Sequence, residues 1–386
     1  MRLPSIILIT VLCLLGKVNV SAAPKTCLDC HSTATPTLVK AWKESRHAAH
    51  DVGCADCHGS DHSNIFEVKG AVSAAVCGSC HGREQREFDQ SLHAIAMDTL
   101  FADARFKKLS PVMQEAGCIG CHQIGAHSSD GSRGKCNSCH SGHSFSAAEA
   151  RQPAACAACH VGADHPHKEM WEASVHGQLF ASDATRDQAP TCVTCHMAKG
   201  THNTSLGLTF GNVANGAALD HVDAVVKMRK ISSKDALKQR EVMVENCLPC
   251  HSSRFASESL AKADQVKFEA DRVLGQAVDA IVSLEEEGLL GDGKGRVQAT
   301  LQDGSVGHSL VLGGDQLYDG LSAVEQRFFD MFKFHHATTF KGAYHQSPEY
   351  THNEGFLRMM QDLTFINNEA SRLRREKPPE AESSKP

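Results

Sequence analysis

One five-residue pattern, Cys-x-x-Cys-His, occurs eight times in this 386-residue chain. Its cysteines are Cys27 and Cys30, Cys54 and Cys57, Cys77 and Cys80, Cys118 and Cys121, Cys136 and Cys139, Cys156 and Cys159, Cys192 and Cys195, and Cys247 and Cys250. The closing histidines are His31, His58, His81, His122, His140, His160, His196 and His251. The pattern is typical of c-type haem attachment, in which both cysteines bind the porphyrin and the histidine binds the iron. We therefore predict eight covalently bound c-type haems.

The cysteine count argues against the two other uses of such a pattern. The motifs contain 16 of the 17 cysteines, so no pair remains for a disulfide framework. An array of zinc sites would not require a histidine directly after every second cysteine. The remaining cysteine, Cys13, lies in the N-terminal apolar segment.

Residues 1–22 have the form of a signal peptide. A short basic start precedes the apolar run 6–15, which is too short to span a bilayer, and small residues precede a cleavage site after Ala22. This predicts export, to the periplasm or otherwise out of the cytoplasm. No later stretch approaches the length of a membrane span, and residues 377–386 are predicted to be a disordered tail.

The rest of the chain predicts a mainly α fold. Aromatic residues make up only 5% and strand-like alternation is nearly absent, so the haems would supply most of the core of residues 23–255. Short helices are expected at 37–50 and 169–180. Residues 256–376 predict a C-terminal domain of long helices, at 256–290, 321–341 and 354–375. A net charge of −6 gives no reason to expect nucleic acid as a partner.

The histidines outside the motifs are candidates for the second axial position of each haem. The motifs use eight of the 24 histidines. We predict as distal ligands His47, His62, His93, His143, His176 and His202. A C-terminal cluster, His335, His336, His345 and His352, suggests that the long helices reach at least one haem. A haem with two histidines only carries electrons, whereas an open iron can transform a small molecule. The histidine count leaves both uses open.

The sequence within and between the motifs resembles the octahaem hydroxylamine oxidoreductase family. The resemblance runs from about Cys27 to Glu354 and is carried by the segments 29–31, 41–47, 51–58, 142–149, 156–165, 189–197 and 201–203. It implies that the fourth-motif haem, held by Cys118, Cys121 and His122, is catalytic.

The resemblance also suggests residues around that haem. Asp164 and His165 match a pair that lines the distal pocket, where a histidine oriented by a carboxylate can relay protons. From the residues alone, His165 could equally be the sixth ligand of a haem. Tyr350 aligns, after a shift of register, with a tyrosine that crosslinks the catalytic haem of a neighbouring subunit in oxidising members. Without the shift, His352 occupies that place.

The resemblance implies redox conversion of small inorganic nitrogen compounds, by hydroxylamine oxidation or by reduction of nitrite or hydroxylamine. Members that lack the crosslink are associated with reduction, which we slightly favour. The other seven haems would exchange electrons with a partner cytochrome or a quinone-linked protein, within a homotrimer. The alternative is a non-catalytic multihaem electron-transfer cytochrome in a respiratory chain. Octahaem reductases that use lysine at the active haem fit poorly, because all eight motifs end in histidine.

Overall fold

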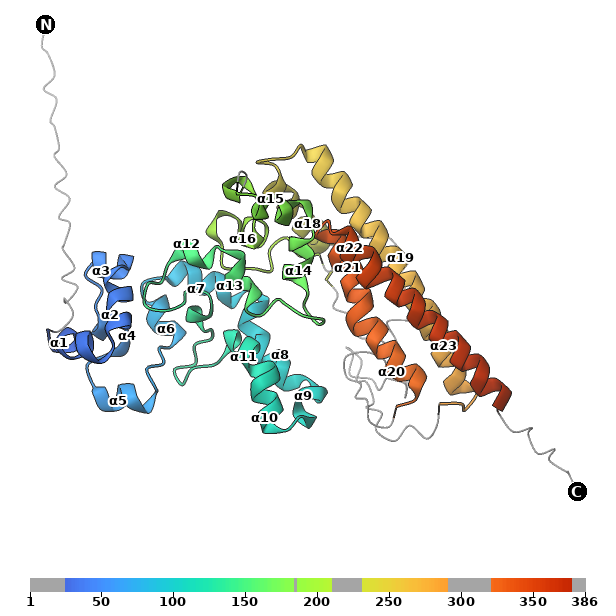
Figure 1. Cartoon of the computed structure of the whole chain (residues 1–386), viewed down its shortest axis with the longest axis horizontal. Coiled ribbons are helices and arrows are strands. Elements are labelled where there is room, and N and C mark those ends of the chain that lie inside the picture. Colours follow the sequence, from blue (N-terminus) through green and yellow to red (C-terminus); the bar gives the residue numbers. More distant parts are fainter. Residues whose placement is uncertain (1–24, 184–185, 210–230, 291–320, 377–386) are drawn as a thin grey trace, which may run out of the picture. The chain divides into compact units, whose positions relative to one another are not determined.

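The computed structural model describes residues 25–183, 186–209, 231–290 and 321–376. Throughout these ranges the regular elements are helices, apart from one isolated antiparallel bridge between His127 and Arg133. The predicted mainly α fold is therefore confirmed (Figure 1). The predicted signal peptide and C-terminal tail lie outside the described residues.

The chain divides into two compact units. The first comprises the residues up to 72 together with 140–146, and the second comprises 73–139 together with the residues from 147 onward. Helices of the first unit are α1 (Lys25–Ala34), α2 (Pro36–Lys43), α3 (Arg46–Ala49), α4 (Cys54–His58) and α5 (His62–Glu67). The boundary that the sequence suggests between 255 and 256 falls within the second unit, and the two-domain division stays a prediction.

Short helices also fill the first part of the second unit. They are α6 (Ala74–Gly78), α7 (Gly82–Asp89), η1 (Leu92–Ile95), α8 (Ala96–Ala102), α9 (Ala104–Lys108), α10 (Pro111–Gln114), η2 (Glu115–Ile119), α11 (Gly120–His122), η3 (Gln123–Gly125), η4 (Cys136–Ser138), α12 (Ala147–Ala150), α13 (Pro153–Ala157), α14 (His167–Glu172), α15 (Val175–Ala181), η5 (Arg186–Gln188), α16 (Cys192–His196) and η6 (Ala198–Gly200). Longer helices come next: α18 (Ser233–Cys247), α19 (Ser253–Glu286), α20 (Ala323–Asp330), η7 (Met331–His336), α21 (Ala337–Tyr344), α22 (Pro348–Thr351), η8 (His352–Phe356) and α23 (Leu357–Glu376).

Buried serines divide the short helices near the motifs. Ser45 Oγ accepts the N–H of Ala48 at 3.1 Å, and α3 therefore begins at Arg46. Ser174 Oγ accepts the N–H of Gly177 at 3.3 Å at the start of α15. A serine side chain that satisfies these N–H groups starts a new helix. Each of the helical stretches expected at 37–50 and 169–180 is consequently two helices.

The C-terminal helices form a conventional apolar core. Residues of α19 spaced three and four apart, such as Val273, Ala277 and Ile281, are buried against α20 and α23. Figure 1 shows α23 running alongside α19. The bundle of long helices predicted from the sequence is present.

Two continuous helices in the described part of this bundle contain a π-helical turn, η7 in one and η8 in the other. Helices α20, η7 and α21 succeed one another from Ala323 to Tyr344 without a break, and η7 is the π-helical part. Ser322 starts the helix with a capping box, accepting from the Glu325 N–H while its own N–H donates to Glu325 Oε2 at 2.9 Å. None of the helices in the described ranges is long and apolar enough to cross a membrane.

Candidate haem sites and catalytic centre

In several motifs a tight helical turn brings the histidine back to the first cysteine. The N–H groups of His81, His160 and His251 donate to the carbonyl oxygens of the first cysteines of their motifs at 2.9, 3.0 and 2.9 Å. The sixteen motif cysteines are free thiols. A chain turn that presents two thiols and an imidazole together is what covalent haem attachment requires.

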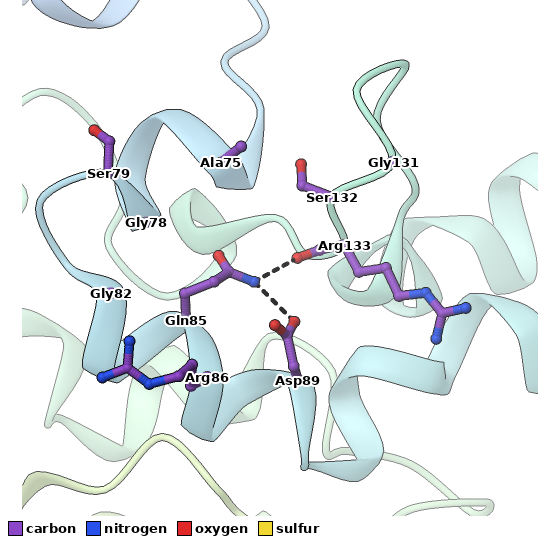
Figure 2. Close-up of a pocket in the computed structure, with 10 residues that line it drawn as sticks. All are labelled: Ala75, Gly78, Ser79, Gly82, Gln85, Arg86, Asp89, Gly131, Ser132 and Arg133. Atoms are coloured by element: carbon purple, nitrogen blue, oxygen red, sulfur yellow. Dashed lines mark hydrogen bonds between the residues drawn. The ribbon is translucent and has the colours of Figure 1, made fainter.

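A cavity opens directly at the third motif. It has a volume of about 640 Å³, within the range of cofactor pockets, and Gly78 and Ser79 from inside the motif form part of its wall. Figure 2 shows Gln85 on α7, whose side-chain amide donates to Asp89 at 2.8 Å and to the Arg133 carbonyl oxygen at 3.2 Å. The cavity thus lies beside the third motif, between α7 and residues 131–133.

Five motif histidines face a second histidine at nearly constant separation. The ring-centre distances are 6.0 Å for His31–His62, 6.1 Å for His58–His143, 6.0 Å for His160–His93, 6.3 Å for His196–His345 and 6.1 Å for His251–His176. Two imidazoles that bind opposite sides of one metal ion, with bonds of about 2 Å, have ring centres about 6 Å apart. The donor set therefore fits haem iron with two axial histidines.

Hydrogen bonds at Nδ1 leave Nε2 for the iron in several of these histidines. His345 Nδ1 donates to the Lys341 carbonyl oxygen at 2.8 Å, and His31 Nδ1 lies 3.0 Å from Thr35 Oγ1. Metal-binding histidines usually donate their second ring N–H in this way, which fixes the ring orientation and the tautomer.

The predicted distal ligands meet this geometry to different extents. His62, His93, His143 and His176 each form one of the five pairs. His47 lies edge-on against Phe145, with ring centres 5.0 Å apart, and the His202 N–H donates to Glu87 Oε2 at 2.9 Å. For His47 and His202 the role of ligand, like the partners of His81 and His140, stays a prediction.

A local sequence pattern marks three of the distal candidates, although their prediction did not depend on it. It reads aromatic-x-x-Ser-x-His and occurs as Trp42/Ser45/His47, Phe88/Ser91/His93 and Trp171/Ser174/His176. All three serines are buried and each immediately precedes a helix or helical turn. Because His93 and His176 face motif histidines, the pattern supports the same role for His47.

The C-terminal histidine cluster separates into different environments. His345 faces His196, so the long helices do approach a motif, as the sequence suggested. His335 and His336 pair instead with the carboxylates of Asp362 and Asp271.

The fourth motif differs locally from the others. Cys118 lies in the π-helix η2, and His122 ends α11. His122 Nδ1 donates to the Ala96 carbonyl oxygen at 2.9 Å, which leaves Nε2 for an iron. Within the described ranges His122 makes no ring contact with another histidine of the kind found in the five pairs.

The Asp164–His165 pair lies beside the sixth motif, which is adjacent to the fourth. The Cys121 and Cys159 thiols hydrogen-bond to each other and thereby connect the two motifs. Asp164 Oδ2 lies 3.3 Å from His165 Nδ1, and Asp164 Oδ1 forms an ion pair with Lys333 Nζ at 2.7 Å. Burial lowers the pKa of His165 to about 4, against the opposing effect of Asp164, so this imidazole is neutral at neutral pH.

Two imidazoles, His93 and His165, lie about equally far from His160, and the geometry favours His93 as its axial partner. His160 Nδ1 lies 3.2 Å from His167 Nδ1, which leaves Nε2 for an iron. His165 has its ring centre 6.2 Å from His160 and 6.0 Å from His167. It therefore lies toward the side of His160 that His167 occupies. The role of His165 as a proton relay stays a prediction.

His167 is a residue that the sequence prediction missed. Its ring centre lies 5.1 Å from His160 and 5.8 Å from His345, so it contacts one axial candidate of each of two neighbouring sites. Burial and Lys341 hold its pKa far below the usual range. The run Asp164-His-Pro-His167 was the only signal in the sequence, since one proline separates His167 from the Asp164–His165 pair.

Tyr350 lies on a second cavity, of about 780 Å³, within the second unit. Its backbone is close to two glycines, since a Cβ on Gly342 would lie 2.8 Å from the Tyr350 carbonyl carbon and one on Gly355 only 2.6 Å from the Tyr350 oxygen. Burial and nearby acids, first among them Glu169, raise the pKa of Tyr350. Its crosslink to a neighbouring haem stays a prediction.

The motif cysteines define which attachment sites are neighbours. Hydrogen-bonded thiols from different motifs are Cys77 and Cys136, Cys121 and Cys159, and Cys156 and Cys192. Three further pairs of thiols lie near each other, because Cys27 raises the pKa of Cys54, Cys156 raises that of Cys139 and Cys247 raises that of Cys195. In the second unit the third, fifth, sixth, seventh and eighth motifs thus form a continuous series, and the fourth joins it at the sixth.

These features define a multihaem c-type cytochrome. The chain matches the family described as "Seven times multi-haem cytochrome CxxCH" over residues 50–297, and it belongs to that family. Residues 15–59 also match cytochrome c554 and c-prime.

Two relatives come from Kuenenia stuttgartiensis. A probable nitrite reductase–hydroxylamine oxidoreductase fusion protein is 27% identical over 91% of this chain and 52% of its own length, so the chain spans about half of that relative. A chain of the reducing HAO-like protein complex is 26% identical, covers 91% of this chain and 85% of its own, and has a TM-score of 0.73. A hypothetical multiheme protein shares the fold, with 19% identity, 92% and 96% coverage and a TM-score of 0.71. The resemblance to the hydroxylamine oxidoreductase family is confirmed.

Proposed function

We propose that this chain is an octahaem oxidoreductase that reduces a small inorganic nitrogen compound, nitrite or hydroxylamine, at the haem of the fourth motif. The observation that carries the proposal is the contrast between His122 and the five paired motif histidines. An iron with an open face supplies the position where such a compound binds and receives electrons.

Residues near this position would transfer protons to the substrate. Reduction of nitrite or hydroxylamine consumes protons together with electrons, so a nearby donor raises the rate. Asp164 holds His165 through Nδ1, which leaves His165 Nε2 as the atom that takes up a proton and passes it to the substrate. Lys333 fixes the other oxygen of Asp164 and so keeps that carboxylate in one orientation. His122 is held in turn by Ala96, which sets the direction of its Nε2.

The remaining seven motifs would carry electrons to this site. The neighbouring thiols support a route through the third, fifth, sixth, seventh and eighth motifs, with the fourth supplied from the sixth. The five histidine pairs supply the two axial ligands that an electron-carrying haem needs. A partner cytochrome or quinone-linked protein would donate the electrons.

The name of the reducing HAO-like complex supports the reductive direction, at 26% identity. Oxidation of hydroxylamine by a chain crosslinked through Tyr350 is the opposite direction. We further propose export by the signal peptide at 1–22 and assembly as a homotrimer.

Carbon monoxide titration of the fully reduced, haem-loaded chain tests the proposal. Binding to about one haem in eight is the expected result. The same preparation should consume nitrite or hydroxylamine with reduced methyl viologen as the electron donor. Absence of carbon monoxide binding would mean that each iron has two protein ligands, and the chain would then be an electron carrier.

A further inference from the structure

The π-helical turn η7 presents three basic side chains to three different carboxylates. The pairs are Lys333 with Asp164 at 2.7 Å, His335 with Asp362 at 2.5 Å, and His336 with Asp271 at 2.7 Å. A π-helical turn contains one residue more than an α-helical turn and is frequent at functional sites. Two of the pairs, those of Lys333 and His335, lie near the proposed catalytic pair, and the third faces α19.

His335 and the loop that carries Asp164 and His165 share one cavity. The cavity of about 780 Å³ is lined by His335 and Asp362 and also by Ala163 and Pro166, which flank the catalytic pair. Ten of its fifteen lining residues carry a polar or charged side chain, so water has hydrogen-bonding partners there. Protons can therefore reach this face of the loop from solvent.

The two members of the His335–Asp362 pair differ in exposure. The Asp362 side chain is 3% exposed, whereas His335 is 25% exposed. Asp362 binds His335 through Nδ1, so Nε2 is the nitrogen that can exchange protons with water. A buried carboxylate that orients a partly exposed imidazole is an arrangement suited to proton transfer.

We propose that His335 is a relay residue that passes protons from this cavity to the Asp164–His165 pair. His335 takes a proton from cavity water at Nε2 and releases it, through water, to His165 Nε2. His165 becomes an imidazolium that faces the Asp164 carboxylate through Nδ1, and it returns to the neutral form when it gives this proton to the substrate. His335 is then reprotonated from solvent, so that it changes by no net proton in each cycle. The electrons arrive separately through the haems. This role rests on the proposed function, and His335 acts through Asp164 and His165 without touching the substrate.

Other charged or titratable side chains line the same cavity and determine its electrostatic potential. They are Glu169, Arg327, Asp330, Tyr350, Glu354 and Arg358. Arg327 also lies 3.5 Å from Asp362 Oδ1, so Asp362 keeps a cationic neighbour when His335 is replaced. Replacement of His335 by glutamine, which can still donate to Asp362 but cannot carry a proton, is therefore compatible with folding.

His336 provides a matched control. It is the next residue, it also donates to a carboxylate, and it is buried against α19 away from the cavity. His336→Gln should disturb packing of the same turn at least as much as His335→Gln. A purely structural role of the turn would thus affect both variants alike.

The test measures proton uptake when the haem-loaded full chain is rapidly reduced in the presence of a pH indicator. His335→Gln should slow proton uptake roughly tenfold or more, while reduction of the haems keeps its wild-type rate. Added imidazole should restore part of the uptake. His336→Gln should take up protons at the wild-type rate. Unchanged uptake in His335→Gln, or equal slowing in both variants without rescue, would overturn the proposal.

Turnover separates this inference from the proposed function. With nitrite or hydroxylamine, His335→Gln should lose kcat and keep KM, and the deficit should shrink as the pH is lowered and solvent protons become abundant. Failure of the wild type to turn over either compound would remove the proposed function. Proton uptake would still decide whether His335 is the relay.

Discussion

The indole N–H of Trp171 donates to the carbonyl oxygen of Pro190 at 3.1 Å, two residues before the seventh haem motif. In the other unit, Trp42 donates to Val52 at 3.0 Å, two residues before the second motif. The helix that begins shortly after Trp171 carries His176, which faces the histidine of the eighth motif. One tryptophan thus connects the start of one motif to the helix that carries the distal ligand candidate of another.

Removal of the helix cap near this tryptophan should destabilise the chain. Ser174→Ala deletes the acceptor of the Gly177 N–H and the donor to the Trp171 carbonyl oxygen. We expect a loss of about 0.5–2 kcal/mol in the free energy of unfolding, measured by denaturant titration of helical circular dichroism. Ser182→Ala, at the exposed end of the same helix, should change it by less than about 0.5 kcal/mol. Equal effects would contradict the capping role.

Replacement of His345 should open a second iron. If His345 is the axial partner of His196, His345→Ala leaves that haem with one protein ligand. Carbon monoxide bound per reduced chain should then rise from about one to about two. His50→Ala, which removes an exposed histidine at the end of α3, should leave the count unchanged. An unaltered count in His345→Ala would assign the seventh-motif haem another ligand.

A methyl group at Gly342 should separate two helices. The added Cβ would lie 2.7 Å from the Thr351 nitrogen and 2.8 Å from the Tyr350 carbonyl carbon, both in the backbone of α22. Backbone atoms cannot move aside as a flexible side chain can, so Gly342→Ala should cost about 1–3 kcal/mol. Thermal unfolding should show the loss, and an unchanged midpoint would mean that α22 moves freely against α21.

The C-terminal helices should lose stability in mild acid. Burial lowers the pKa of His336 in the folded chain, despite the opposing effect of Asp271. Folding therefore favours the neutral form of His336. The stability that this residue contributes to the folded chain is fully present above the unfolded pKa of about 6.5, and it declines as the pH falls below that value. Urea unfolding at pH 8 and pH 5.5 should reveal this decline. His336→Gln should reduce the pH dependence in that window, and an unreduced dependence would assign it to other groups.

The haem motifs and the helical class were predictable because both are local. The fixed spacing of Cys77, Cys80 and His81 needs only one helical turn, and the periodicity of the stretch around Val273 needs only one helix. The serine that precedes His93 and His176 by two residues stands in the sequence, but the prediction of these ligands did not use it.

The partners of the C-terminal histidines were not predictable, because they depend on packing between distant segments. His345 meets His196 only after the long helices have folded onto the motif region. The hydrogen bond between His336 and Asp271 likewise forms only when α19 and η7 pack together. Sequence analysis also did not detect the extra residue in η7, because one continuous helix was expected over 321–341.

The extra residue in η7 fixes the angular phase of α21. Each residue of an α-helix advances the chain by about 100° and 1.5 Å, so deleting one residue from η7 would rotate α21 by more than a quarter turn relative to α20. Gly342 would then no longer meet Tyr350, and His345 would point away from His196. The π-helical turn therefore sets the rotation of α21 relative to α20. With this rotation the apolar face of α20 packs against the core of the bundle, while His345 at the end of α21 faces His196.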